Sequence, residues 1–228
     1  MSELTSKIRS RGHWEVIIAP TSFVAGRIEY SALWPTIQRV SVNLRGWDFP
    51  HVDPHVLPLN EATWVGQESE WHQYKEAWRF FQSGQFVDLA GLWEDWLDES
   101  ALDRKPEDWQ IGQLLGVTNT IHRFTEIYEF ASKLMASTVT DEPVELSITL
   151  FGLENRRLYN EDPHTFPFMH ERKTSMKDFP FSKVYSQLEL LGQTRELALE
   201  PAIELFKRFD WNPTPDLIGE RQARIGKW

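Results

Sequence analysis

The sequence predicts an α+β fold, with a mostly antiparallel twisted sheet, a long amphipathic helix and a C-terminal helix packed on it. Alternating apolar and polar residues at 40–44 and 144–150 indicate strands with one buried face. Over 118–137, apolar residues recur every three or four positions, which indicates one long helix. Because helices separate groups of strands and do not follow every strand, the pattern favours α+β over doubly wound α/β.

The N-terminal quarter predicts two strands and one short helix. A first strand is expected over 13–23, where apolar and polar residues alternate. Ser31 is a suitable N-cap for a helix through Gln38, with a proline in its first turns. A second strand is expected over 39–45. The three prolines of 46–58 exclude a helix and predict an ordered loop.

The middle of the chain predicts a hairpin. Residues 64–68 are expected to form a strand, and 75–82 and 85–90 are expected to pair around a turn. Gly84 in that turn can adopt the positive φ that tight hairpin turns require. Tryptophan and leucine side chains at 92–97 are spaced like one face of a short helical turn.

The C-terminal part predicts another strand, a long loop and helices. The strand is expected at 144–153, followed by an ordered aromatic-rich loop over 159–180. A further strand is expected at 181–190. The helix expected at 193–209 contains Pro201, which should kink it or start it afresh, and a short helix should close the chain.

Composition indicates one globular domain. The 228 residues are 41% apolar and 25% charged, and no break in composition divides them. We therefore expect a single domain over 1–228 with a flexible N-terminal segment. The absence of cysteine excludes disulfides and thiolate metal sites. No signal-peptide-like or membrane-length apolar run occurs, so a cytoplasmic location without membrane association is expected.

The formal net charge of −10 disfavours nucleic acid as a general partner. Local basic patches could still form at the two ends of the sequence. Their residues are Lys7, Arg9 and Arg11, and Arg221, Arg224 and Lys227. These cations are either solvated terminal residues or a nucleic-acid contact, and a nucleic-acid-binding accessory protein stays as one alternative.

Eleven tryptophans are an unusual number for this length. One group combines several indoles with other aromatic residues: Trp71, Trp78, Trp93, Trp96 and Trp109, with Tyr74, Phe80 and Phe81. These rings either form a core layer under the hairpin or display a surface that anchors a protein partner. Homo-oligomerisation stays open.

The segment 45–51 follows a predicted strand and enters a rigid loop, a common place for binding sites. Arg45 offers an anion clamp, Asp48 an acceptor and His51 a titratable base. The same residues could simply close a turn over Trp47. The binding candidates are Arg45, Trp47, Asp48, His51, Trp71 and Trp78.

A divalent metal is the alternative to having no cofactor. In an extended chain, His51, Asp53 and His55 would lie on one side and could act as metal ligands. A fourth ligand would come from His164, His170 or Glu171. The acidic run Glu94, Asp95, Asp98 and Glu99 could also hold a cation, although a solvated face is the favoured interpretation. The sequence lacks phosphate-loop, nucleophile-elbow and helical zinc motifs, so no residue is assigned a catalytic role.

Four segments carry a resemblance to a known family. They are Trp14-Glu15-Val16-Ile17, the run from Leu44 to His51, Ser83-Gly84-Gln85-Phe86 and Phe124-Thr125-Glu126-Ile127. Over about 10–140 the chain resembles a family of uncharacterised bacterial proteins that occur alone or joined to Schlafen-like AlbA putative DNA-binding modules. The resemblance implies a bacterial cytoplasmic setting and an accessory or sensing role.

The leading hypothesis is a non-enzymatic accessory module whose aromatic-rich surface docks a protein partner, for example in a stress-response or phage-defence complex. The absence of a catalytic motif in the sequence motivates it. The enzymatic alternative is a metal-dependent hydrolase or nuclease that uses the loop histidines with Asp48 or Asp53.

Overall fold

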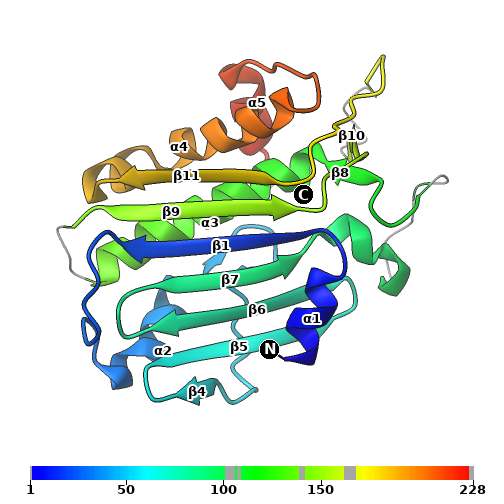
Figure 1. Cartoon of the computed structure of the whole chain (residues 1–228). Coiled ribbons are helices and arrows are strands. Elements are labelled where there is room, and N and C mark those ends of the chain that lie inside the picture. Colours follow the sequence, from blue (N-terminus) through cyan, green and yellow to red (C-terminus); the bar gives the residue numbers. More distant parts are fainter. Residues whose placement is uncertain (1, 101–105, 107–108, 139–141, 162–167, 226–228) are drawn as a thin grey trace.

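A seven-stranded antiparallel sheet forms the centre of the protein (Figure 1). The computed structural model describes residues 2–100, 106, 109–138, 142–161 and 168–225. In sheet order the strands are β11 (Phe179–Tyr185), β9 (Val144–Phe151), β1 (His13–Pro20), β7 (Phe86–Gly91), β6 (Tyr74–Phe81), β5 (Trp64–Trp71) and β4 (Leu59–Glu61). The predicted α+β class and the antiparallel sheet are confirmed.

Helices cover one face of the sheet and form the main core with it. They are α2 (Tyr30–Val40), α3 (Val117–Thr138), α4 (Gln187–Lys207) and α5 (Pro215–Gln222). The central helix is α3, which confirms the expected long amphipathic helix, and Phe124 on it packs edge-on against Trp14 of β1 at 5.2 Å. Apolar residues alternate along β1, so that Trp14, Val16 and Ile18 all point into this core.

The opposite face of the sheet carries one helix, α1 (Glu3–Arg9), which lies in front of the strands in Figure 1. Its Leu4 and Ile8 are buried against Ala77 of β6 and Leu89 of β7. The segment that was expected to be flexible therefore contains a helix docked on the sheet. Its apolar face is short, with only two buried residues, and is easily missed in a helix of this length.

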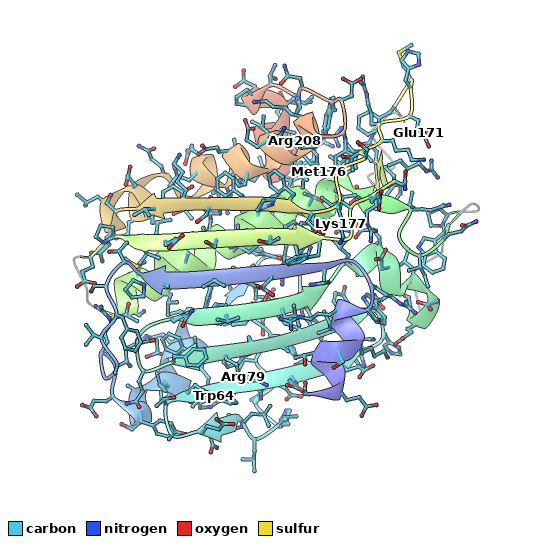
Figure 2. The ribbon with its side chains drawn as sticks, viewed as in Figure 1. Trp64, Arg79, Glu171, Met176, Lys177 and Arg208 are labelled. Atoms are coloured by element: carbon cyan, nitrogen blue, oxygen red, sulfur yellow. The ribbon has the colours of Figure 1, made fainter. Side chains whose placement is uncertain are left out.

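Beyond α1, the same face also carries paired polar side chains. Arg79 of β6 lies over the Trp64 ring, 4.7 Å from its centroid, and forms an ion pair with Glu68 (Figure 2). The guanidinium thus covers the indole while its charge is neutralised.

Two short antiparallel strands replace the strand expected over 39–45. Helix α2 continues to Val40, because Ile37 and Val40 extend its buried stripe, and Pro35 lies inside it. Only β2 (Val42–Asn43) is extended, and it pairs with β3 (Asp48–Phe49). The valines at 40 and 42 suggested alternation, but they belong to different elements.

The C-terminal elements begin earlier than expected. Strand β11 ends at Tyr185, and Ser186 caps α4 in a capping box with Glu189. The helix is kinked at Gln193 rather than at Pro201, which the helix accommodates. The serine and glutamate three residues apart are a helix-start signal that outweighs the strand-like run after them.

The remaining elements lie near the N-terminus of α3. They are the 3-10 helix η1 (Trp93–Glu99) and two parallel strands, β8 (Leu114–Gly116) and β10 (Arg157–Tyr159). The helical turn predicted at 92–97 is confirmed by η1. Within the described residues, no helix combines the length and the apolar character needed to cross a bilayer.

Candidate binding surface

Four aromatic side chains form a layered group, the aromatic stack, defined by Trp47, His51, Tyr74 and Trp71. The Trp47 ring lies 3.9 Å from the His51 ring and 4.4 Å from the Tyr74 ring, centroid to centroid. The Trp71 ring lies 5.9 Å from Trp47, with an angle of 3° between the planes. Trp71 is 56% exposed, so the stack opens to solvent at this residue.

The turn of the β5–β6 hairpin positions half of the stack. Trp71 ends β5 and pairs across the ladder with Tyr74, the first residue of β6. The short turn between them is possible because His72 adopts a left-handed conformation, with φ of 48°. The two rings therefore project side by side from a tight connection instead of from a long mobile loop.

The β2–β3 hairpin positions Trp47. Gly46 has φ of 86°, a value that glycine adopts without strain, and its N–H donates to Asn43 Oδ1 at 3.0 Å. Asn43 Nδ2 donates to Asp48 Oδ1 at 2.6 Å. Asp48, expected as a ligand acceptor, instead closes the turn that presents Trp47.

Two backbone contacts fix His51. Its N–H donates to Glu76 Oε2 at 3.0 Å, and its carbonyl oxygen accepts from Trp78 Nε1 at 2.8 Å. Just beyond it, the Gln67 side chain accepts from Asp53 N–H and donates to the Asp53 carbonyl, at 3.0 and 2.9 Å. Buried side chains of the sheet thus hold the proline-containing loop in place under the stack.

A buried polar cluster lies behind this loop. Glu76 and Asp88 face the core from neighbouring strands, and Arg123 of α3 pairs with Asp88 at 3.0 Å. Burial, and then repulsion from Asp88, raise the pKa of Glu76 well above its usual value, and burial also raises the pKa of Asp88. Among the described residues, Glu76 Oε1 and Asp88 Oδ1 are buried without a hydrogen-bond partner, which agrees with the unfavourable burial of these carboxylates. The cluster is sealed from solvent and supports the loop.

Arg45 joins the β2–β3 hairpin to helix α3. Its guanidinium forms two hydrogen bonds of 2.7 Å with the Glu126 carboxylate, and Nη1 donates to Asn119 Oδ1 at 3.0 Å. Burial, and then the positive charge of Arg45, lower the pKa of His122 to about 4, so this imidazole is neutral at neutral pH. The expected anion clamp is therefore occupied by a carboxylate of the protein itself.

The structure separates the candidate aromatic residues. Trp78 is buried, stacks on Trp34 at 6.0 Å and belongs to the core, which fits the core-layer alternative for this residue. Trp96 is also buried, beneath Arg11 at 4.0 Å. Trp71 is the exposed indole of the predicted group and lies beside Trp47 and Tyr74, whereas Trp93 and Trp109 are half-buried.

The predicted metal ligands are engaged in other contacts where the structure describes them. Within the described part of the chain, no three His, Asp or Glu side chains are grouped so that they could hold a metal ion. His51 is engaged with Trp47, and Asp53 Oδ1 accepts from the N–H of His55 at 2.8 Å. The expected triad is not assembled, and His164 lies outside the described residues.

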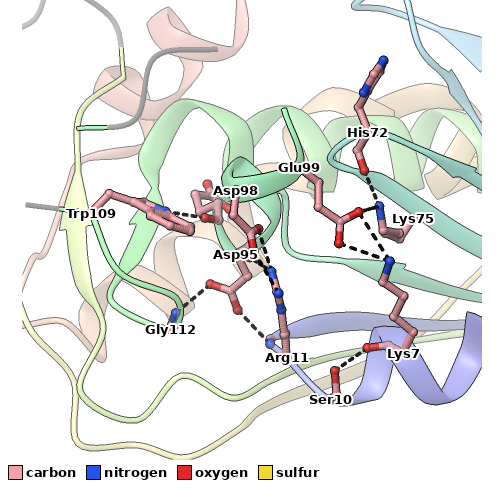
Figure 3. Close-up of polar contacts among 12 residues, drawn as sticks. Lys7, Ser10, Arg11, His72, Lys75, Asp95, Asp98, Glu99, Trp109 and Gly112 are labelled. Atoms are coloured by element: carbon pink, nitrogen blue, oxygen red, sulfur yellow. Dashed lines mark hydrogen bonds and ion pairs between the residues drawn. The ribbon is translucent and has the colours of Figure 1, made fainter. Parts of the chain in front are cut away.

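The acidic run and the N-terminal cations neutralise one another (Figure 3). Lys7 and Lys75 both pair with Glu99, at 3.1 and 2.8 Å, and Arg11 pairs with Asp98 at 2.8 Å. The figure also shows Asp95, whose carboxylate accepts from backbone N–H groups while Arg156 pairs with it at 2.5 Å. Glu94 and Asp95 are buried, so this run is not a solvated face.

The basic ends do not form a free cationic patch among the described residues. Arg9 pairs with Glu15 at 3.2 Å, and Lys7 and Arg11 are paired as above. At the other end, Arg221 is buried and donates to Asn160 Oδ1 at 2.8 Å. Lys227 lies outside the described residues.

Comparison with known proteins gives no information about the function of this surface. No family model, curated protein or solved structure matches the chain. The resemblance to the bacterial family stays a prediction.

Proposed function

We propose that the protein is a non-enzymatic binding or accessory module that docks a protein partner through the aromatic stack. The observation that carries the proposal is the exposed Trp71 ring, held parallel to Trp47 on a rigid hairpin. Tryptophan and tyrosine dominate interface hot spots, because they bury a large area at a small cost in side-chain entropy.

The fixed geometry of the stack favours binding. Trp47 is held by a closed turn, and His51 is anchored through its backbone to Glu76 and Trp78. A partner that covers Trp71 therefore orders few groups, which reduces the entropic cost of association. Additional apolar side chains flank β5 on the edge of the sheet, namely Val56, Leu57 and Leu59, of which Leu57 is 87% exposed.

Charge favours a protein over a nucleic acid as the partner. The chain has a net charge of −10, and the N-terminal cations are engaged in ion pairs with Glu70, Glu99, Glu15 and Asp98. Phosphate backbones would be repelled by this field. Together with the resemblance of residues 10–140, this supports an accessory role in a bacterial cytoplasmic complex, such as a stress-response or phage-defence assembly.

A quantitative co-purification from the native host tests the proposal. Wild-type protein, Trp71→Ala and Phe23→Ala would be compared, where Phe23 is a matched exposed aromatic residue, 82% accessible, in another loop. We expect a partner retained by wild type and Phe23→Ala, and bound at least about thirtyfold more weakly by Trp71→Ala, which corresponds to about 2 kcal/mol.

Two results would refute this function. One is a partner retained equally by Trp71→Ala and wild type. The other is stoichiometric metal in the purified protein that is lost in His51→Ala with His55→Ala, because it would point to the hydrolase or nuclease alternative.

A further inference from the structure

A groove runs between the outer faces of α4 and α5, with a volume of about 830 Å³. In Figure 1 these helices lie beyond β11, whereas the aromatic stack is built from β5, β6 and the β2–β3 hairpin at the far side of the sheet. The lining consists of an outward stripe from each helix: Glu196, Leu199, Glu200, Ile203 and Glu204, and Pro215, Asp216, Gly219 and Glu220.

The floor of the groove is apolar and open. Leu199 and Ile203 are partly buried and rest on the main core. Gly219 lies opposite them, where a Cβ would meet only the Leu199 Cδ1 atom, at an ordinary 3.8 Å. Because residue 219 is a glycine, there is open space next to Leu199 and Ile203, and apolar groups of a ligand could fill this space.

The rim of the groove is strongly acidic. Five carboxylates border it, and two of them have a lysine partner, with Lys183 paired to Glu200 at 2.7 Å and Lys207 to Glu204 at 2.6 Å. In the described parts of the chain, no cation pairs with Glu196, Asp216 or Glu220. Glu196, Glu200 and Glu204 are spaced by four residues on α4, an arrangement of like charges that destabilises an isolated helix.

We propose that this groove binds a basic amphipathic helix from a partner protein. Apolar side chains of such a helix would rest on Leu199, Ile203 and the space at Gly219, and its lysines or arginines would face the rim. Charge complementarity selects this occupant, because an acidic or neutral helix would leave the row of carboxylates repelling itself. The groove is separate from the aromatic stack, so the protein would join two partners as an adaptor.

A designed peptide serves as the probe. It is a fluorescein-labelled helix with leucine on one face and lysine on the other, and its matched peptide carries glutamate in place of lysine. Binding is measured by fluorescence anisotropy at low and high salt. We expect the lysine peptide to bind the wild-type protein, to bind more weakly as salt rises, and the glutamate peptide not to bind.

A variant whose groove is filled by a larger side chain distinguishes docking in the groove from general electrostatic attraction to an acidic protein. Gly219→Leu adds an aliphatic side chain to the open space without changing the charge, and the replacement of a helical glycine should not lower the melting temperature. Gly192→Leu is the matched control, because Gly192 lies on α4 outside the groove lining and a Cβ there meets nothing within 4 Å. Gly219→Leu should weaken binding by about tenfold or more, and Gly192→Leu should leave it unchanged.

The rim has its own variant, Glu196→Gln with Glu220→Gln, which should weaken binding and flatten its dependence on salt. No binding of the lysine peptide to wild type would overturn the proposal. Equal loss of affinity in both glycine variants, or no loss in either, would also overturn it. These measurements do not involve Trp71, so their outcome is independent of the test of the aromatic stack.

Discussion

Replacing Glu94 with glutamine should stabilise the protein relative to wild type, and this gain in stability should be larger at alkaline pH than at acidic pH. The Glu94 side chain is buried, and its Oε1 accepts from Gly116 N–H at 2.8 Å. Burial, and then repulsion from Glu161, raise its pKa from 4.5 to about 7. A Cβ at Gly116 would overlap with oxygens of both carboxyl groups, so the two lie close together.

The sign and size of this effect follow from proton linkage. Below pH 4.5 the carboxyl group is protonated in both states and costs nothing. As the pH rises from 4.5 towards 7, the carboxyl group ionises in the unfolded state but stays protonated in the folded state, so the free energy of unfolding falls. Above pH 7 this loss of stability reaches its full value of about 3 kcal/mol. Between pH 5 and pH 8 the wild type should therefore lose about 2.5 kcal/mol that Glu94→Gln does not lose.

Urea unfolding of both proteins at pH 5 and pH 8 measures the difference directly. Titrating groups that do not interact with Glu94, such as His122, are present in both proteins and cancel in the comparison. Exposed Glu154 supplies a control, since Glu154→Gln should show the pH dependence of wild type. Parallel stability profiles for wild type and Glu94→Gln would refute the assignment of a raised pKa to this buried carboxyl group.

Two further contrasts test the structure through the free energy of unfolding in urea. Arg156→Met leaves Asp95 as a buried, unpaired charge and should cost about 3–5 kcal/mol, while Arg208→Met at an exposed position should change stability by less than about 0.5 kcal/mol. Trp78→Ala should cost about 3–5 kcal/mol, while Trp71→Ala should cost less than about 1 kcal/mol. Equal costs within either pair would contradict the burial that the structure assigns to these side chains.

Local patterns were sufficient for the regular elements of this fold. The hairpin around Gly84 follows from a glycine with φ of 85° between two alternating runs, and α3 follows from a long apolar repeat. The pattern failed where two elements meet, as at Val40 and Val42, because helix and strand periodicities cannot be separated over a few residues. It failed again after Ser186, where a capping box starts a helix in a run that is strand-like by its apolar content.

The candidate surface was only partly predictable, because it depends on contacts between distant segments. Trp47, His51 and Trp71 were each identifiable as candidates, but only the folded chain brings them together with Tyr74. Burial of Trp78 was hard to predict, since Trp78 shares a face of its strand with the charged Glu76, which is more typical of a solvent-exposed face. Both residues point into the core, where burial and the nearby Asp88 raise the pKa of Glu76.

The docking of α1 has a practical consequence for anyone who shortens this protein. Removal of residues 2–9 would uncover Ala77 and Leu89 on two central strands of the antiparallel sheet and would take away the Lys7 partner of Glu99. Shortened chains should therefore self-associate face to face in solution, and an apparent oligomer seen with them would arise from the trimming and not from the intact molecule.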